Sequence, residues 1–297
     1  MKKNINGIFL MLTGLAVFTA CSDDWGTTPG TDATPNVTIY QYDAPEGYDE
    51  ENDITVRLVG NQQTSEIYYF AEKTADKDAR ELSDDAYADF VVNNGTKASV
   101  SENNLPEGII AETVITGLAG EWTVSAVAVG NGQKKLSTIE YSTLPWNTLA
   151  TGTYIANVNA SVQNLFANAF GSNQVTVQLQ QLETDPHQYR LKNLWGRKQS
   201  LLFNVCTGED GNAITGEDED GVYTFLRIPQ QATPFTFGNY GTVGVRDVGL
   251  WQGDDSWVTE KGYESGIYED NSVFFMIQYF VSAGNVGYGY DYFIPGE

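Results

Sequence analysis

Cysteine and histidine are nearly absent from this chain of 297 residues, which contains two cysteines and one histidine. A metal site built on several imidazoles or thiolates is therefore excluded, as is a framework of disulfides. His187 lies in a turn-like segment with no nucleophile motif around it, which argues against histidine-assisted hydrolysis. Cys206 follows an apolar run and is expected to be a small packed side chain rather than a nucleophile.

Basic residues are scarce as well, since 16 Lys and Arg stand against 39 Asp and Glu, for a net charge of −23. Such a chain repels phosphate backbones, so nucleic acid is excluded as a partner. Two acidic, glycine-containing segments, 43–53 and 209–221, make calcium the single candidate cofactor, because oxygen-rich turns suit Ca²⁺. Neither segment has the ligand spacing of an EF-hand, and solvated turns are the alternative interpretation.

Long hydrophobic runs are confined to the beginning of the chain, where Lys2 and Lys3 precede the apolar segment 8–18. This pattern predicts a signal peptide over residues 1–20, and nothing later approaches the ~20 apolar residues of a membrane-spanning helix. The sequence Phe18-Thr19-Ala20-Cys21 resembles the lipobox of bacterial lipoproteins. That resemblance implies cleavage before Cys21, acylation of its thiol, and attachment to the outer membrane through the lipid.

Residues 21–36 contain turn formers and hydroxyls without apolar periodicity, which predicts a flexible tether. The tripeptide Ser22-Asp23-Asp24 directly behind the cysteine is similar to the export signal of Bacteroidota surface lipoproteins. The resemblance implies an outer-membrane location facing the cell exterior. Whether the chain faces the exterior or the periplasm stays open at this point.

Residues 37–144 read as successive strands with alternating patterning, which predicts an all-β first domain. The passage 112–129, with a Gly117-Leu118 corner leading to an aromatic residue and alternating valines, resembles a fibronectin type III domain. Trp122 stands where that family carries its corner tyrosine. The segment 83–95 predicts an inserted helix, with Ser83 as its cap and Asn94-Gly95 at its end. The resemblance implies an immunoglobulin-like sandwich that acts as a spacer.

Residues 146–297 predict a second antiparallel β domain, a sandwich or a barrel-like sheet, with a short helix closing one end around 162–170. The segment 273–281 is apolar on both faces, so something is expected to pack on each side of it. Gly152-Thr153-Tyr154 followed by the segment 189–196 resembles a pattern in Bacteroidota surface lipoproteins of unassigned function. Proteins associated with them take part in polysaccharide capture.

Aromatic residues provide the candidate binding site. Trp251 and Trp257 flank a polar turn, and flat rings beside amides and carboxylates are what a sugar requires. Alternation places Tyr288, Tyr290 and Tyr292 on one face of an extended strand, and Trp195 completes the candidate ligand-binding residues. The alternative is that these rings pack in the core or pair across strands.

The sequence therefore predicts a lipid-anchored surface protein with a fibronectin-like spacer and a distal β domain that binds polysaccharide, without catalytic residues. The alternative is a structural or protein-interaction subunit of a surface complex, with the same aromatic side chains buried. A cryptic glycoside hydrolase is a third interpretation, because two suitably spaced carboxylates would be enough.

Overall fold

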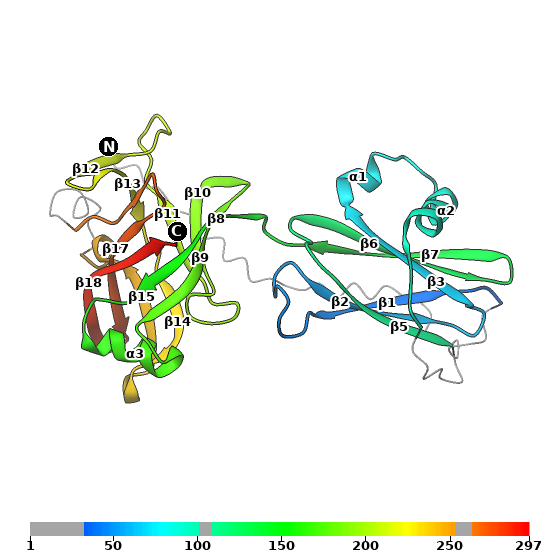
Figure 1. The fold of residues 1–297 in the computed structure, drawn as a ribbon, viewed down its shortest axis with the longest axis horizontal. Helices are drawn as coiled ribbons and strands as arrows, with labels where there is room; N and C mark the ends of the chain where they lie inside the picture. Colours follow the sequence, from blue (N-terminus) through cyan, green and yellow to red (C-terminus); the bar gives the residue numbers. More distant parts are fainter. Residues whose placement is uncertain (1–32, 101–107, 253–262, 297) are drawn as a thin grey trace, which may run out of the picture.

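The computed structural model describes residues 33–100, 108–252 and 263–296, which form two β-rich bodies joined end to end (Figure 1). The strands of the first body are β1 (Val37–Asp43), β2 (Ile54–Gly60), β3 (Glu66–Lys73), β4 (Thr96–Lys97), β5 (Ile109–Ile115), β6 (Glu121–Gly130) and β7 (Gln133–Ser142). The strands of the second are β8 (Trp146–Ile155), β9 (Gln174–Leu182), β10 (Asp185–Lys192), β11 (Leu201–Val205), β12 (Thr215–Asp218), β13 (Gly221–Arg227), β14 (Gln231–Thr236), β15 (Thr242–Asp247), β16 (Gly266–Tyr268), β17 (Val273–Val281) and β18 (Gly284–Pro295). The helices are α1 (Thr74–Asp78), α2 (Asp84–Asn94), α3 (Ala160–Phe170), α4 (Val248–Gln252) and the 3₁₀ turn η1 (Gly238–Tyr240).

The first body is a sandwich of two antiparallel sheets, ordered β1-β2-β5 and β4-β3-β6-β7. Two antiparallel sheets packed face to face confirm the predicted all-β sandwich. Alternate residues of the strands meet between the sheets, where Val56, Leu58 and Val124 are fully buried. Asn131 and Gly132 both have positive φ, as a two-residue hairpin between β6 and β7 requires.

The corner before β6 contains the tryptophan that replaces the fibronectin tyrosine. Leu118 is fully buried, and the indole Nε1 of Trp122 donates a hydrogen bond to the carbonyl oxygen of Ala119 at 2.9 Å. A corner tyrosine likewise bonds to backbone a few residues upstream. Trp122 therefore provides the same kind of closure with an indole N–H.

The predicted helix is present as α2, which packs on the outer face of the β3-β6-β7 sheet. Ser83 is its N-cap, and its hydroxyl accepts a hydrogen bond from the N–H of Ala86. Tyr87 and Val91 on its inner face contact Val127, so the insertion covers sheet surface that would otherwise face water.

Removing this cap gives a testable stability change. We expect Ser83→Ala to lower the free energy of unfolding of the sandwich by about 1 kcal/mol, because one N–H in the first helical turn loses its partner. Urea titration followed by fluorescence measures the change. Ser83→Asp should retain nearly all the stability, since aspartate caps a helix as well as serine does; an equal loss in both variants would contradict the capping role.

The second body is a closed barrel, which resolves the sequence alternatives of sandwich and barrel. Antiparallel pairs connect β8, β9, β10, β11 and β13 in order, and β16 bridges β13 to β17. The ring closes because β17 pairs with β18 and β18 pairs with β8. The strands follow one another in nearly sequential order around this ring, while β12 extends β13 and the β14–β15 hairpin extends β17.

Side chains fill the interior of the barrel, so it is a packed core rather than a lumen. Phe203, Phe275 and Phe293 point inward and are fully buried. The helix α3 closes one end, as predicted, with Phe166 packed against Tyr154 inside the barrel (Figure 1). Its N-cap is Asn159, whose side chain accepts a hydrogen bond from the N–H of Val162.

The chain enters the sandwich at the end remote from the barrel. In Figure 1 the first residues of β1 lie at the far end of the sandwich, and β1 runs from there toward the barrel. Within the described residues, no helix combines the length and the apolar character needed to cross a membrane.

Candidate functional site

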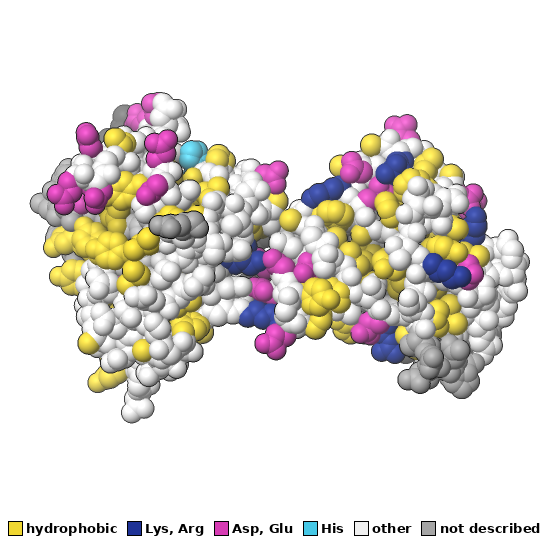
Figure 2. All heavy atoms as spheres, viewed as in Figure 1, with side chains coloured by type: hydrophobic (Ala, Val, Ile, Leu, Met, Phe, Trp, Pro, Cys, Tyr) yellow, Lys and Arg dark blue, Asp and Glu magenta, His cyan; other side chains and the backbone are white. Residues whose placement is uncertain are grey.

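An aromatic surface covers the outside of the barrel where β13, β16, β17 and β18 lie side by side. Strand alternation produces it, because the neighbouring residues Ile267, Phe275 and Phe293 belong to the interior core. We call this cluster the aromatic face; its side chains are Tyr223, Phe225, Trp251, Tyr268, Phe274, Tyr288, Tyr290 and Tyr292. Tyr223 and Phe225 are buried, at 7% exposed, whereas Tyr288 and Tyr292 are exposed to solvent. Figure 2 shows hydrophobic side chains gathered on this part of the barrel.

Ring contacts run across the aromatic face from one strand to the next. The ring of Tyr223 lies 5.0 Å from that of Phe274 and 5.7 Å from that of Tyr268. Phe274 contacts Tyr290 at 6.2 Å, and Tyr290 stacks on Tyr292 at 6.3 Å. These separations are typical of favourable aromatic pairs, so the rings support one another as a preformed surface.

Two glycines allow the central ring to lie against the sheet. A Cβ at Gly216 on β12 would come within 2.6 Å of the ring of Tyr223, and a Cβ at Gly266 would meet both Tyr223 and Phe274 closer than 3.0 Å. Glycine in a strand commonly marks such a close approach. The sequence positions of these glycines therefore set how the aromatic face packs.

Most of the described candidate residues meet on the aromatic face. Tyr288, Tyr290 and Tyr292 lie on one side of β18, with Gly287 and Asp291 on the other, as the alternation predicted. Tyr288 and Tyr292 are exposed, at 44% and 36%. Trp251 lies on α4 rather than in a turn, and its ring is 5.1 Å from that of Tyr288. Trp257 falls outside the described residues.

The prediction for Trp195 was wrong. Its side chain is only 4% exposed and packs in the barrel core with Leu194 and Leu201. The residue follows β10 in a tight turn that directs the indole inward, so it cannot meet a ligand at the surface. Cys21, the predicted lipidation site, lies outside the described residues.

Sequence patterns did not identify the other half of the aromatic face. Tyr223, Phe225 and Tyr268 come from strands whose pairing could not be inferred, because β16 is short and is separated from its neighbours by loops. One signal was present, namely the apolar outer side of β17. Phe274 lies on that side among the rings of the aromatic face, and α4 packs near the same strand, so side chains lie against both faces of β17, as predicted.

Carboxylates surround the aromatic face. The Asp218 side chain accepts a hydrogen bond from the hydroxyl of Tyr268 at 2.6 Å. Burial raises the pKa of Tyr290 to about 12, and the negative charge of Glu264 adds to the increase. Burial, then Glu264 and Asp218, raise the pKa of Tyr223 in the same way. Burial is the larger cause of both shifts, and the nearby carboxylates add to it because negative charge disfavours ionisation of a phenol.

The acidic segment 43–53, a calcium candidate in the sequence, connects the two bodies. Its side chains bond to the β10 region of the barrel through the pairs Asp43–Lys198, Asp49–Lys192, Glu50–Asn193 and Glu51–Arg190. The guanidinium of Arg190 binds both oxygens of Glu51, with one N–O distance of 2.8 Å, and stacks on Trp146 at 4.4 Å. These carboxylates therefore have cationic or amide partners within the chain.

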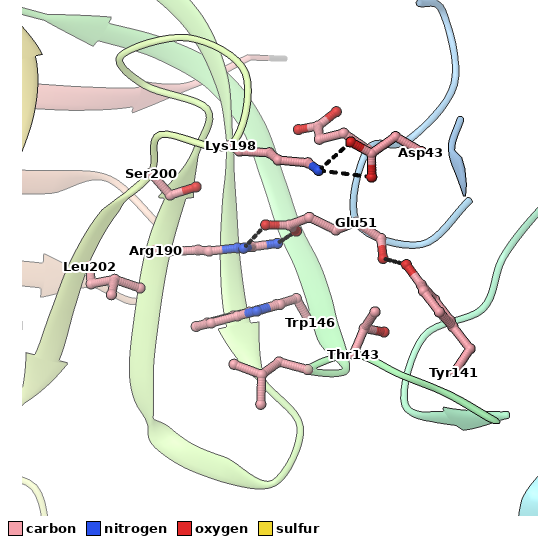
Figure 3. Close-up of a pocket in the computed structure, with 11 residues that line it drawn as sticks. Asp43, Glu51, Tyr141, Thr143, Trp146, Arg190, Lys198, Ser200 and Leu202 are labelled. Atoms are coloured by element: carbon pink, nitrogen blue, oxygen red, sulfur yellow. Dashed lines mark hydrogen bonds and ion pairs between the residues drawn. The ribbon is translucent and has the colours of Figure 1, made fainter. Parts of the chain in front are cut away.

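A cavity of about 510 Å³ lies at this junction, lined by side chains of both bodies (Figure 3). Figure 3 shows the Arg190 guanidinium between Glu51 and Trp146, and Lys198 reaching Asp43. Because these charges already form ion pairs, the cavity belongs to a docking interface between the two bodies. Among the described residues, no group of three or more His, Cys, Asp or Glu side chains is placed to hold a metal ion.

Fold and surface define the class: a two-body all-β protein with a packed barrel and a preformed aromatic surface on its outside. Comparisons with family models, with curated proteins and with solved structures found no match for this chain.

Proposed function

We propose that this chain is a lipid-anchored protein of the outer membrane, of the Bacteroidota surface type, that binds polysaccharide through the aromatic face of its barrel and catalyses no reaction. The observation that carries the proposal is that the aromatic side chains of β18 share one face of the strand, where Tyr290 stacks on Tyr292 and Tyr288 pairs with Trp251, and that Tyr288 and Tyr292 are exposed. Sugar rings present C–H faces that stack on aromatic side chains, while their hydroxyls take hydrogen bonds from polar neighbours.

The packed interior supports an external site. Barrels that enclose small ligands keep space between their strands, whereas Phe203, Phe275 and Phe293 fill this one. A ligand must then be held on the outside, and polymers suit an open surface of this kind better than small molecules, which are normally buried in concave pockets.

The arrangement of the two bodies supports a spacer role for the sandwich. A tether attached before Val37 would begin at the end of the sandwich remote from the barrel (Figure 1). The barrel would then be the part held farthest from a lipid attached to Cys21, with the aromatic face available to extracellular polymers.

Alanine substitutions on the aromatic face test the proposal. We expect Tyr288→Ala and Trp251→Ala each to weaken binding of a retained polysaccharide about tenfold, because each removes roughly 1 to 1.5 kcal/mol of ring contact. Affinity electrophoresis against a panel of soluble polysaccharides identifies the ligand, and isothermal titration calorimetry then measures the loss.

Tyr240→Ala is the matched control, since Tyr240 is an exposed tyrosine of the same barrel that lies on η1, away from the aromatic face. It should leave the affinity unchanged. If no polysaccharide in the panel is retained, or if all three variants bind as tightly as the native chain, glycan binding through the aromatic face is refuted.

A further inference from the structure

The charges of the barrel are divided between its two sides. Arg190, Lys192 and Lys198 face the sandwich and form ion pairs there. The aromatic face is instead bordered by Asp218 and Asp220 on the β12–β13 hairpin and by Glu264 just before β16. Figure 2 shows acidic side chains beside the hydrophobic patch and basic ones at the junction.

The bordering carboxylates have no cationic partner among the ion pairs of the described residues. Asp218 is held toward the rings by the Tyr268 hydroxyl, and its other oxygen accepts the backbone N–H of Asp220 at 2.9 Å. The acidic border is therefore fixed by the hairpin, next to rings whose faces carry negative quadrupole density.

Rings bordered by carboxylates that have no cationic partner among the described residues favour a cation. An ammonium group gains from the face of an aromatic ring and from a nearby carboxylate at the same time, whereas an anionic polymer is repelled by both. We propose that the glycan taken by the aromatic face carries free ammonium groups, so that its ligand is a polymer of amino sugars. This inference rests on the proposed glycan-binding function and names the substrate class for the same site.

Two oligomers with the same sugar backbone, one carrying ammonium groups and one carrying neutral acetamido groups, test it. Oligomers of β-linked glucosamine and their fully N-acetylated counterparts of equal length would be titrated by calorimetry at about pH 5.5, above the range in which exposed carboxylates protonate. We expect the glucosamine oligomer to bind at least about tenfold more tightly at low salt. The difference should largely disappear at about 1 M salt, where the Debye length is ~3 Å.

Charge-neutral variants locate the effect on the acidic border. We expect the double variant Asp220→Asn with Glu264→Gln to remove most of the preference for the glucosamine oligomer while leaving binding of the N-acetylated oligomer unchanged. Glu183→Gln is the control, because Glu183 is an exposed carboxylate in the β9–β10 turn, outside the border. It should leave the preference intact.

The other possible outcomes overturn either the amino-sugar inference alone or the glycan-binding function as well. Equal binding of both oligomers overturns the charge inference and leaves the glycan function standing. Binding of neither, together with no binding by any neutral polysaccharide, overturns both. If oligolysine of matched charge binds as tightly as the glucosamine oligomer, and Tyr288→Ala does not weaken it, the acidic border serves a basic protein segment and the amino-sugar inference is wrong.

Discussion

Replacing Asp291 with alanine is expected to lower the free energy of unfolding of the barrel by about 3 to 5 kcal/mol, because several buried donors lose their acceptor at once. One carboxylate oxygen accepts from the hydroxyls of Tyr154 and Tyr279, at 2.7 and 2.8 Å. The other accepts from the backbone N–H groups of Asn157 and Val158. The residue thus ties the turn before α3 to β18 from inside the barrel.

The same carboxylate should make stability depend on pH. Burial raises the pKa of Asp291 to about 6, above the value of about 3.9 expected in the unfolded chain. Between those values the folded state binds more protons than the unfolded state, so this group lowers the stability as the pH rises from about 4 to 6. A difference of about two pKa units corresponds to about 3 kcal/mol.

Asp291→Asn separates the two effects. Asparagine retains the shape and one of the two acceptor oxygens but does not titrate, so the stability of this variant relative to the native chain should increase by about 3 kcal/mol between pH 4 and pH 7. Urea titrations of both proteins across that range measure the difference. Tyr279→Phe, which removes one donor only, should cost about 1 kcal/mol and preserve the pH dependence. Parallel pH profiles for the native chain and the Asp291→Asn variant would refute the assignment.

Much of the fold could be predicted because local patterns determine it. The alternation in β9 and β18, the Ser83 cap and the Gly117-Leu118 corner each act over a few residues, and the structure contains all of them. Closure of the barrel could not be predicted, because it depends on β16, a three-residue strand that pairs with β17 across a short turn and with β13, which lies about 40 residues earlier in the chain. Three residues are too few to show the alternation from which a strand is predicted.

The candidate site was likewise predicted only where local patterns determine it. Tyr288, Tyr290 and Tyr292 share a face through spacing along one strand, which a sequence reveals directly. Tyr223 and Phe274 join them only through pairing of distant strands, and Trp195 was misassigned because a turn, rather than a strand, orients its ring. The acidic segment 43–53 was read as a solvated turn or a calcium loop, whereas its partners lie about 140 residues away in β10.

That segment explains why the two bodies act as one unit in the proposed function. Its backbone is shaped internally, since Asp49 accepts the N–H groups of Glu51 and Asn52 and Asp53 accepts that of Gly117. These hydrogen bonds hold the loop in shape independently of the barrel, and its carboxylates are presented together to the cations of β10. A spacer joined in this way would hold the aromatic face at a set angle, rather than on a loose linker.

Replacing Arg190 with methionine is expected to weaken docking of the barrel on the sandwich by about 2 to 4 kcal/mol. Methionine keeps the apolar stem over Trp146 but leaves Glu51 and Gln180 without their shared partner. Small-angle X-ray scattering should show a broader distribution of distances between the two bodies. Calorimetry should show two separate unfolding transitions in place of a coupled one.

Arg246→Met is the matched control, because Arg246 stacks on Phe280 and bonds to Gln278 within the barrel without reaching the sandwich. It should leave the scattering profile unchanged. The double variant Arg190→Met with Glu51→Gln should recover part of the docking energy, since neither charge is then left unpaired in the interface. Identical scattering from the native chain and Arg190→Met would show that the ion pair does not hold the junction.

The junction should also open in acid. Burial alone would raise the pKa of Asp49, but the hydrogen bond and charge of Lys192, together with the backbone N–H groups of Glu51 and Asn52, outweigh it and the pKa is lowered. The pKa of Glu50 is lowered in the same way, by the hydrogen bond from Asn193 together with a backbone N–H and the charge of Lys192. A pKa lowered by docking stabilises the docked form above the ordinary carboxylate range and loses that contribution as the pH falls through it. We therefore expect the scattering of the native chain to approach that of Arg190→Met below about pH 4. Asp49→Asn should reduce the size of this change, because lysine then faces a neutral side chain at every pH.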